Sequence, residues 1–368
     1  MPKFIPLASP DIREADINAV NQVLKSGMLV QGNEVARFES SIGEYTGAAN
    51  VIASSNGTST MHIALCILGV GPGDEVIVPA FSYIATANVV ELVGATPVFV
   101  DIDRETFNIS VKNIEAVITS KTKAIIPVHE FGLPCDIAEI IRIAQKHDLA
   151  VIEDAACALG ANFEGQHVGT FGDFGSFSLH PRKAISSGEG GLITTNRSDY
   201  AEKARTLRNH GIGELDGKMA FIAAGFNYRM TDFQAALVNS QFERFDAIME
   251  KKQFLAELYL QDIQHPAITL PIVPDNRSHS WQTFHILLND DLDRDLVIQT
   301  LKEKGIGTNY GAQCIPAQHF YQEKYGLDAA AFFPNAWNAY HQGIALPLYE
   351  KLSRADIAYI AREINKLK

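Results

Sequence analysis

The sequence of 368 residues is poor in cysteine, and its few cysteines show no pairing pattern. They are Cys66, Cys135, Cys157 and Cys314. No CxxC pair occurs, and none of the four stands at a metal-type spacing from a histidine. We therefore expect neither a disulfide framework nor a zinc or other metal site.

An excess of positive charge is also missing. The chain has 31 lysines and arginines against 43 aspartates and glutamates, a formal net charge of −12, so we do not expect a nucleic acid as its partner. The opening residues, MPKFIPLASPDI, lack the apolar stretch of a signal peptide, and no apolar run is long enough to span a bilayer. We expect a cytoplasmic protein without a membrane partner.

Two common phosphate-binding motifs are absent as well. No GxxxxGK[ST] sequence occurs, and no GxGxxG follows the first expected strand. This disfavours a nucleoside triphosphate site and a Rossmann dinucleotide site. It leaves room for another phosphate-bearing cofactor.

What the sequence does contain is an alternation of apolar strand-like runs with helix-like segments, which predicts an α/β domain with a mostly parallel central sheet. We expect strands at 75–78, 96–100, 124–128 and 149–152, and helices at 60–68, 85–92, 111–118 and 137–146. Beyond Asn196 we expect helices at 200–208, 231–250, 293–304 and 353–368, and a strand at 281–288. The chain length favours two domains, a large α/β domain at 1–250 and a smaller α+β domain at 251–368.

Asp154 stands at the end of an expected strand, after Leu149–Ile152. Ligands of open α/β sheets bind outside the carboxyl ends of the strands, where a carboxylate can balance a cation or accept a hydrogen bond from a ring nitrogen. The alternative is a helix cap, a frequent use of aspartate. On its own, this residue leaves both interpretations open.

A turn of small residues, Ser54-Ser55-Asn56-Gly57-Thr58-Ser59, precedes the expected helix at 60–68. Free amides and the positive end of the helix dipole can bind a phosphate there. The same residues would equally serve as an ordinary helix cap and tight turn.

Lys183 lies in the segment FSLHPRKAISSGEGG, residues 177–191, close to His180 and Arg182. It could be a solvated lysine, a phosphate clamp or a reactive amine that attacks a carbonyl. Chemistry based on pyridoxal 5′-phosphate (PLP) needs a lysine, an acid for the ring nitrogen, a helix N-terminus for the phosphate and a stacking aromatic ring. Lys183, Asp154, the turn at 57–59 and Tyr83 would supply these four parts.

The sequence closely resembles the DegT/StrS-type sugar aminotransferases, which are fold-type I, aspartate-aminotransferase-like PLP enzymes. The resemblance runs nearly end to end. It rests on eight segments in the expected order: Ser9-Pro10-Asp11 with Ser26-Gly27, Asn56-Gly57-Thr58, 72–76 (PGDEV), 153–156 (EDAA), 177–183 (FSLHPRK), 188–191 (GEGG), His210-Gly211 and 225–232 (GFNYRMTD).

The resemblance assigns roles to matching residues. Lys183 would form a Schiff base with PLP and move the substrate proton, and Asp154 would keep the pyridine nitrogen protonated. The phosphate would be held by Ser178 and by the turn at Gly57, Thr58 and Ser59. Tyr83 would stack on the ring. Asn227 would reach the phosphate of a partner subunit, which implies a homodimer with shared active sites.

Two departures from the family pattern affect the site. Cys157 stands near the expected position of the 3′-oxygen of PLP, where relatives commonly carry glutamine or histidine. In the run Thr308–Cys314, which helps to form the sugar pocket in the family, relatives often carry a histidine that is absent here. Tyr310 and Gln313 of this run are candidate substrate contacts, as are His180 and Arg182.

The resemblance implies an aminotransferase that passes an amino group, from L-glutamate as donor, to keto carbon C3 or C4 of a nucleotide-linked deoxysugar. Lipopolysaccharide, capsule and antibiotic sugars are all compatible products. A PLP-dependent sugar dehydratase of the same superfamily is an alternative, although its members carry histidine in place of Lys183. A non-catalytic sensor or regulatory homologue is a second alternative.

Overall fold

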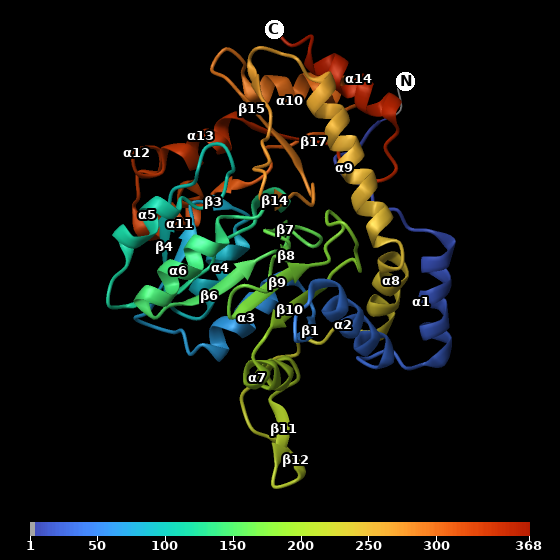
Figure 1. Cartoon of the computed structure of the whole chain (residues 1–368), viewed down its shortest axis with the longest axis vertical. Helices are drawn as coiled ribbons and strands as arrows, with labels where there is room; N and C mark the ends of the chain where they lie inside the picture. Colours follow the sequence, from blue (N-terminus) through green and yellow to red (C-terminus); the bar gives the residue numbers. More distant parts are fainter. Residues whose placement is uncertain (1–3) are drawn as a thin grey trace.

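A seven-stranded sheet forms the centre of the molecule in the computed structural model, which describes residues 4–368 (Figure 1). The strand order is β1-β10-β9-β6-β5-β2-β4. Strands β9, β6, β5, β2 and β4 are parallel, whereas β10 runs antiparallel to both of its neighbours. The strands are β1 (Asn50–Ser54), β2 (Glu75–Pro79), β4 (Thr96–Val100), β5 (Thr122–Ile125), β6 (Ala150–Asp154), β9 (Phe174–Ser178) and β10 (Gly191–Thr195). The predicted α/β class with a mostly parallel sheet is confirmed.

Helices cover both faces of this sheet because alternate strand residues point to opposite sides. Val76 and Val78 pack on the side of α3 (Gly57–Ile67), α4 (Ala85–Leu92) and α7 (Ser198–Arg208). Ile77 packs on the other side with α5 (Val111–Ile114) and α6 (Ile137–His147). Near β1 and β10 that second face is covered by α2 (Asn33–Thr46) and α8 (Asp232–Phe242). Both faces are buried, which explains the uninterrupted apolar runs in the sequence.

Most expected elements agree with the structure to within a few residues, and two differ in an instructive way. Strand β5 ends at Ile125 instead of residue 128, since Pro127 has no amide to donate to the sheet. The helix expected at 231–250 is two helices, α8 and α9 (Phe245–Asp262). The break is at Arg244, whose backbone is not helical and whose guanidinium bonds both carboxylate oxygens of Asp16 at 2.8 Å. This long-range ion pair explains why the local pattern did not reveal the break.

The C-terminal part forms a second hydrophobic cluster around a three-stranded sheet, β13 (Ile268–Thr269), β15 (Phe284–Leu288) and β17 (Gly343–Leu346). Helices α9, α10 (Arg294–Glu303) and α14 (Arg354–Ile364) pack against it. Helix α9 runs through the expected boundary at residues 250 and 251, so the division into two domains stays a prediction.

The remaining elements are short or peripheral. They are α1 (Glu14–Ser26), β3 (Phe81–Ser82), β7 (Asn162–Phe163), β8 (Gln166–His167), β11 (Ile212–Leu215), β12 (Lys218–Phe221), β14 (Arg277–Ser278), β16 (Gln313–Cys314), α11 (His319–Tyr325), α12 (Ala329–Phe332) and α13 (Pro334–Gln342). Strand β16 pairs with β3, which ties the C-terminal part to the start of α4.

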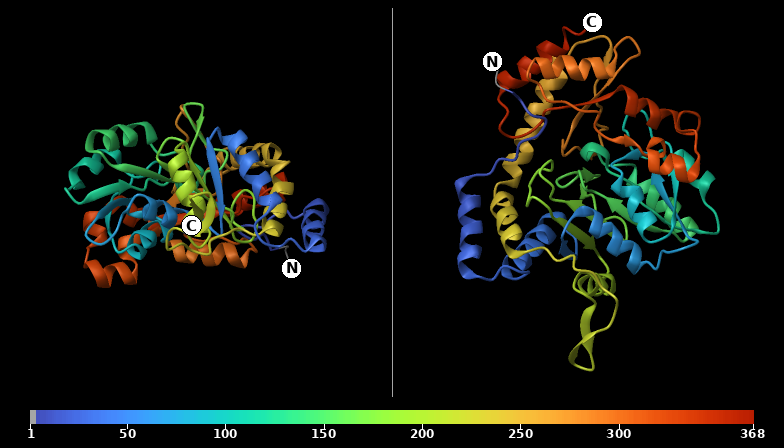
Figure 2. Two further views of the ribbon diagram at one scale, coloured as in Figure 1. Left: turned by 90° about the horizontal axis from the view of Figure 1, so that it is seen from below. Right: turned by 180° about the vertical axis from the view of Figure 1, so that it is seen from behind.

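Strands β11 and β12 form a hairpin that projects from the body of the molecule below α7 (Figure 1). Figure 2 shows this hairpin at the end of the molecule opposite α14. Its side chains include the exposed apolar residues Leu215, Met219 and Phe221. Within residues 4–368, no helix combines the length and the apolar character needed to cross a bilayer.

Candidate active site

Asp154 ends strand β6 at the carboxyl edge of the sheet and is 5% exposed. Its Oδ2 accepts a hydrogen bond from the Thr86 hydroxyl at 2.8 Å, and its Oδ1 accepts one from the Ala156 amide at 3.2 Å. Burial raises the pKa of the Asp154 carboxyl. The residues that follow form turns and then strand β7, so Asp154 caps no helix and the ligand-binding interpretation is the one that the fold favours.

Lys183 lies in the loop between β9 and β10, and its Nζ is 3.1 Å from the Cys157 Sγ. Burial raises the pKa of the Cys157 thiol, and the positive charge of Lys183 acts in the opposite direction on both this thiol and Asp154. The ends of the loop are joined by a hydrogen bond from the Leu179 amide to the Gly190 carbonyl, and its interior is held by one from the Ser186 amide to the Gln241 side chain. The structure therefore brings Lys183, Asp154 and Cys157 together.

The N-terminus of helix α3 forms the opposite wall of this site. Asn56 is the cap, and its side chain accepts a hydrogen bond from the Ser59 amide at 2.7 Å. The sequence analysis expected the Ser59 amide to contact the phosphate. This amide is used by the cap instead, because the first amides of a helix have no partner within the helix. The amides of Gly57 and Thr58 donate no hydrogen bond within residues 4–368. These two amides remain the better candidates for an anion.

Gly57 and Ser178 face each other across the helix terminus and the end of β9. A Cβ at Gly57 would lie 3.1 Å from the Cβ of Ser178, and one at Gly191 would lie 2.5 Å from the carbonyl carbon of Asn56. Glycine at these positions lets the helix terminus approach the strand ends, and it leaves the two amides beside the Ser178 hydroxyl.

Tyr83 lies at the junction of β3 and α4, and Gln313 lies in β16, which pairs with β3. Tyr83 is 67% exposed, which leaves its ring accessible to a ligand. Gln313 is opposite Ser82 in the β16–β3 pairing, and its Oε1 is buried without a hydrogen-bond partner in the described chain.

Of the other predicted residues, Arg182 precedes Lys183 in the chain, and His180 accepts a hydrogen bond at its carbonyl from the Lys183 amide at 2.8 Å. His180 is exposed, and its Nδ1 accepts a hydrogen bond from the Arg182 amide at 3.3 Å. The Arg182 carbonyl is bound by the Gln282 amide group at 3.0 Å. Asn227 is exposed beside the hairpin, and Tyr310 packs edge-to-face on Tyr340.

The sequence analysis missed two residues of this site, Thr86 and Glu130. Thr86 lies in the first turn of α4, where no motif marks it. Glu130 is 4% exposed and lies where the chain beyond β5 runs beside the end of β6, with the His129 amide bound to the Asp154 carbonyl. Glu130, like Asp154, lies beyond the carboxyl end of a parallel strand. The reasoning that selected Asp154 would therefore have identified Glu130 as well.

The contacts of Glu153 and His129 indicate that both residues have a structural role. The Glu153 carboxylate accepts hydrogen bonds from the amides of Gly169, Phe171 and Gly172 and lies 3.0 Å from the His129 Nε2. Both side chains are fully buried. They hold the turn at 169–172 against the end of β6, and thereby stabilise the strand that carries Asp154.

The architecture matches that of solved sugar aminotransferases. The apo form of the putative sugar aminotransferase Spr1654 from Streptococcus pneumoniae is 30% identical and superposes with a TM-score of 0.93 over 98% of this chain and 96% of that one. The same protein has been solved in PLP and PMP forms. Helicobacter pylori PseC, an aminotransferase involved in the biosynthesis of pseudoaminic acid, is 27% identical with a TM-score of 0.92 over 98% of both chains. The uncharacterized protein MJ1066 from Methanocaldococcus jannaschii is 36% identical over 99% of this chain and 97% of its own length.

Fold and comparisons together define a PLP-dependent sugar aminotransferase of fold type I. Residues 10–365 match the model of the DegT/DnrJ/EryC1/StrS aminotransferase family, and the chain belongs to that family.

The residues at the site fit the cofactor of this family. The free amides of Gly57 and Thr58 and the Ser178 hydroxyl offer donors for a phosphate. The Asp154 carboxyl lies buried at the other wall, and the Lys183 amine lies near it. The site therefore offers a complementary group for the phosphate, the ring nitrogen and the aldehyde of the cofactor.

Proposed function

We propose that this aminotransferase transfers an amino group from L-glutamate to keto carbon C3 or C4 of a nucleotide-linked deoxysugar, and that it works in the cytoplasm. The observation that carries the proposal is the placement of Lys183: its amine lies at the carboxyl edge of the sheet, 3.1 Å from the Cys157 Sγ and within electrostatic reach of Asp154.

Bound PLP would supply an aldehyde that a lysine amine can attach to and a ring that withdraws electrons from the reacting carbon. Lys183 would attach the cofactor and then carry the proton at its Nζ in both half-reactions. Asp154 would hold a proton on the ring nitrogen, and the Thr86 hydroxyl orients the Asp154 Oδ2 for that contact. Tyr83 would stack on the ring, and Cys157 would lie near its 3′-oxygen as a weak hydrogen-bond donor.

A homodimer with shared active sites is part of the proposal. The exposed apolar side chains of the hairpin at 212–221 support it, since such a projecting surface is typical of an interface. Asn227 is exposed just beyond this hairpin and would reach the phosphate in the partner subunit.

The first test is the colour of the purified protein after incubation with PLP. We expect a visible absorbance from the lysine-bound cofactor, which L-glutamate bleaches with formation of 2-oxoglutarate. Lys183→Ala should lose this absorbance, and Lys302→Ala, at an exposed position of α10, should keep it. Absorbance that persists in Lys183→Ala would refute the assignment of this lysine.

The substrate is tested by incubating the protein with L-glutamate and a panel of nucleotide-linked 3-keto and 4-keto sugars. Mass spectrometry should detect an amino sugar nucleotide from at least one of them. Bleaching by glutamate without any amino sugar product would retain the donor and reject this acceptor class.

A further inference from the structure

A bend at residues 280–282, just before β15, reaches the lysine loop from the C-terminal part of the chain. Its central residue, Trp281, is 2% exposed and has a left-handed backbone with φ 50°. Such a conformation is unfavourable for a bulky aromatic residue and persists only where its surroundings impose it. Because strained residues of this kind concentrate at functional sites, the two neighbours of Trp281 are candidates for a functional role.

Three contacts hold Trp281 in this conformation. Its amide donates to the His279 Nδ1 at 2.8 Å, its indole Nε1 donates to the Gln253 Oε1 of α9 at 2.6 Å, and its ring stacks on the His279 imidazole with 4.0 Å between the ring centroids. Burial lowers the pKa of His279 to about 3, so this imidazole is neutral and can accept a hydrogen bond at Nδ1. These contacts fix the bend on the C-terminal part.

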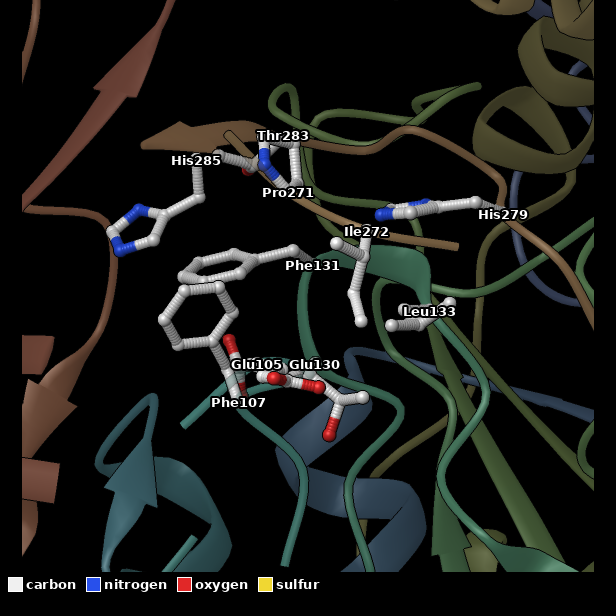
Figure 3. A pocket seen from close by; sticks show the side chains of 11 residues that line it. Glu105, Phe107, Glu130, Phe131, Leu133, Pro271, Ile272, His279, Thr283 and His285 are labelled. Carbon is white, nitrogen blue, oxygen red and sulfur yellow. The ribbon is translucent and has the colours of Figure 1, made fainter. Parts of the chain in front are cut away.

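The bend also packs on the chain segment that follows β5. The Ser280 amide donates to the Gly132 carbonyl at 3.0 Å. The Thr283 amide donates to the Phe131 carbonyl at 3.3 Å. Figure 3 shows His279 and Thr283, the residues on either side of the bend, lining a small pocket together with Phe131. The bend therefore joins the C-terminal part to the carboxyl edge of the large sheet.

Gln282, the last residue of the bend, holds the peptide unit between Arg182 and Lys183. Its Nε2 donates to the Arg182 carbonyl at 3.0 Å, and the amide of the same peptide unit, that of Lys183, donates to the His180 carbonyl at 2.8 Å. A peptide unit is planar, so two hydrogen bonds at its opposite ends fix its orientation. The Lys183 Cα belongs to this plane, and the starting point of the lysine side chain is therefore fixed as well.

The orientation of the Gln282 side-chain amide follows from its second partner. Its Oε1 accepts a hydrogen bond from the Thr283 hydroxyl at 2.8 Å, which leaves the NH₂ group for the Arg182 carbonyl. Since a carbonyl oxygen can only accept, the opposite orientation would place two acceptors against each other.

Ser280, the first residue of the bend, holds the segment that carries Cys157. The residue is 1% exposed, and its hydroxyl donates to the Cys157 carbonyl at 2.8 Å. A Cβ at Gly132 would lie 2.1 Å from the Ser280 Oγ and 2.9 Å from the Cys157 carbonyl oxygen, so only glycine leaves room for this contact. The Sγ of the same cysteine is the atom that lies 3.1 Å from the Lys183 Nζ.

We propose that the bend at 280–282 positions the Lys183 amine for its reaction with the cofactor, with Gln282 as the positioning residue. One end of the bend holds the backbone beside Lys183 and the other holds the backbone of Cys157, so the spacing that Trp281 imposes sets the separation of amine and thiol. That Lys183 carries the cofactor rests on the proposed function, whereas the contacts that hold this lysine do not.

The direct test is hydrogen exchange of the full chain without cofactor, read by mass spectrometry on the peptides that cover 180–187. Gln282→Met keeps the length of the side chain without a donor. We expect it to make exchange in this segment about 5-fold faster, which is the factor that one net hydrogen bond contributes. Gln282→His offers a donor nitrogen at the same number of bonds from its Cβ and should restore the wild-type rate.

The matched control is Gln318→Met. The Gln318 Nε2 donates to the Cys314 carbonyl at the same distance of 3.0 Å, on a segment that does not carry the lysine, so exchange at 180–187 should stay unchanged. Thr283→Val frees the Gln282 amide from its second partner and should give a smaller increase, which keeps the test available if Gln282→Met does not fold. Wild-type exchange in both Gln282→Met and Thr283→Val would overturn the proposal.

The second readout is the rate at which saturating L-glutamate bleaches the PLP-loaded protein. A displaced amine slows the transfer, so this rate should fall about 10-fold in Gln282→Met. The glutamate concentration at half-maximal rate should stay the same, because the Gln282 amide is occupied by Arg182 and Thr283. A change in that concentration with an unchanged maximal rate would contradict a positioning role. A wild type that does not bind PLP would refute the proposed function alone, and the exchange result would still decide how Lys183 is positioned.

Discussion

At the scale of single residues, the site consists of a few side chains whose partners are few and specific. The Lys183 amine contacts the Cys157 thiol, and the Asp154 carboxyl is bound by one hydroxyl and one amide. Burial raises the pKa of Asp154, so its charge depends on a cationic partner. A protonated ring nitrogen would be such a partner.

Asp154→Asn should lower kcat by about 10²- to 10³-fold, since the amide keeps the shape but cannot stabilise a protonated ring nitrogen. Steady-state rates with L-glutamate and the keto sugar would measure this. Asp136→Asn, a half-exposed carboxylate nearby in the sequence, should stay close to wild type. A loss of less than about 3-fold in Asp154→Asn would contradict the proposed role, since such a change is far below the factor expected for a lost electrostatic partner.

The stability of the folded chain should also depend on Glu130, because burial, and then the negative charge of Asp154, raise its pKa to about 8. An unfolded glutamate releases its proton near about pH 4.3, whereas the folded chain holds it up to about pH 8. Between these values the folded state binds more protons, so this group's contribution to stability is present at low pH and is lost as the pH rises.

Glutamine has no proton that titrates in this range. As the pH rises from 5 to 8, Glu130→Gln should therefore become more stable relative to wild type. Urea unfolding midpoints at the two pH values would measure the difference, with Glu105→Gln, a change at an exposed glutamate, as the control. A stability difference that does not change with pH would be incompatible with a raised pKa at Glu130.

At the scale of elements, the sheet and the helix termini place the reacting groups. Parallel strands β5 and β6 end at the same edge, which brings Glu130 near Asp154. Helix α3 begins beside the end of β9, so its free amides lie next to Ser178. The cap at Asn56 keeps this terminus in place.

Asn56→Ala removes the cap of α3 and should cost about 1 kcal/mol of stability. It should also weaken PLP binding, since the terminus that presents Gly57 and Thr58 loses its anchor. Thermal unfolding and a cofactor titration would measure the two effects, and Asn56→Ser, which retains a capping oxygen, should restore both. Unchanged PLP affinity in Asn56→Ala would argue against a phosphate site at this terminus.

At the scale of the whole molecule, the projecting hairpin at 212–221 is an exposed apolar surface. Met219 is 73% exposed and Phe221 is 71% exposed on an arm that projects away from the body. A second copy of the chain is the occupant that we propose, because the exposed Asn227 follows on the same segment.

Replacing Met219 and Phe221 with serine should shift the protein from twice 40.3 kDa toward the single-chain mass of 40.3 kDa in light scattering. PLP affinity should fall with it, since Asn227 would no longer reach a partner. Leu296→Ser, an exposed apolar residue on α10, is the control and should leave the mass unchanged. A wild type that is monomeric at all concentrations would overturn the shared-site model.

The fold could be predicted in large part from the sequence because its elements follow from local periodicity. Strand β4 and helix α4 have the expected bounds, and the continuous apolar runs are buried on both faces. The two helices α8 and α9 were expected as one, since Arg244 breaks the helix through an ion pair with Asp16, 228 residues away in the sequence. Local patterns carry no information on such a contact.

By itself, the sequence determined the α/β class and, through its motifs, the family and the cofactor. Those properties depend on residue types at short spacings. Only the tertiary structure decided that the Ser59 amide is used by the Asn56 cap, and that the Thr86 hydroxyl joins Asp154 and Ser82. These features depend on which donors remain free after the chain has folded, and hydrogen-bond partners from distant segments settle that question.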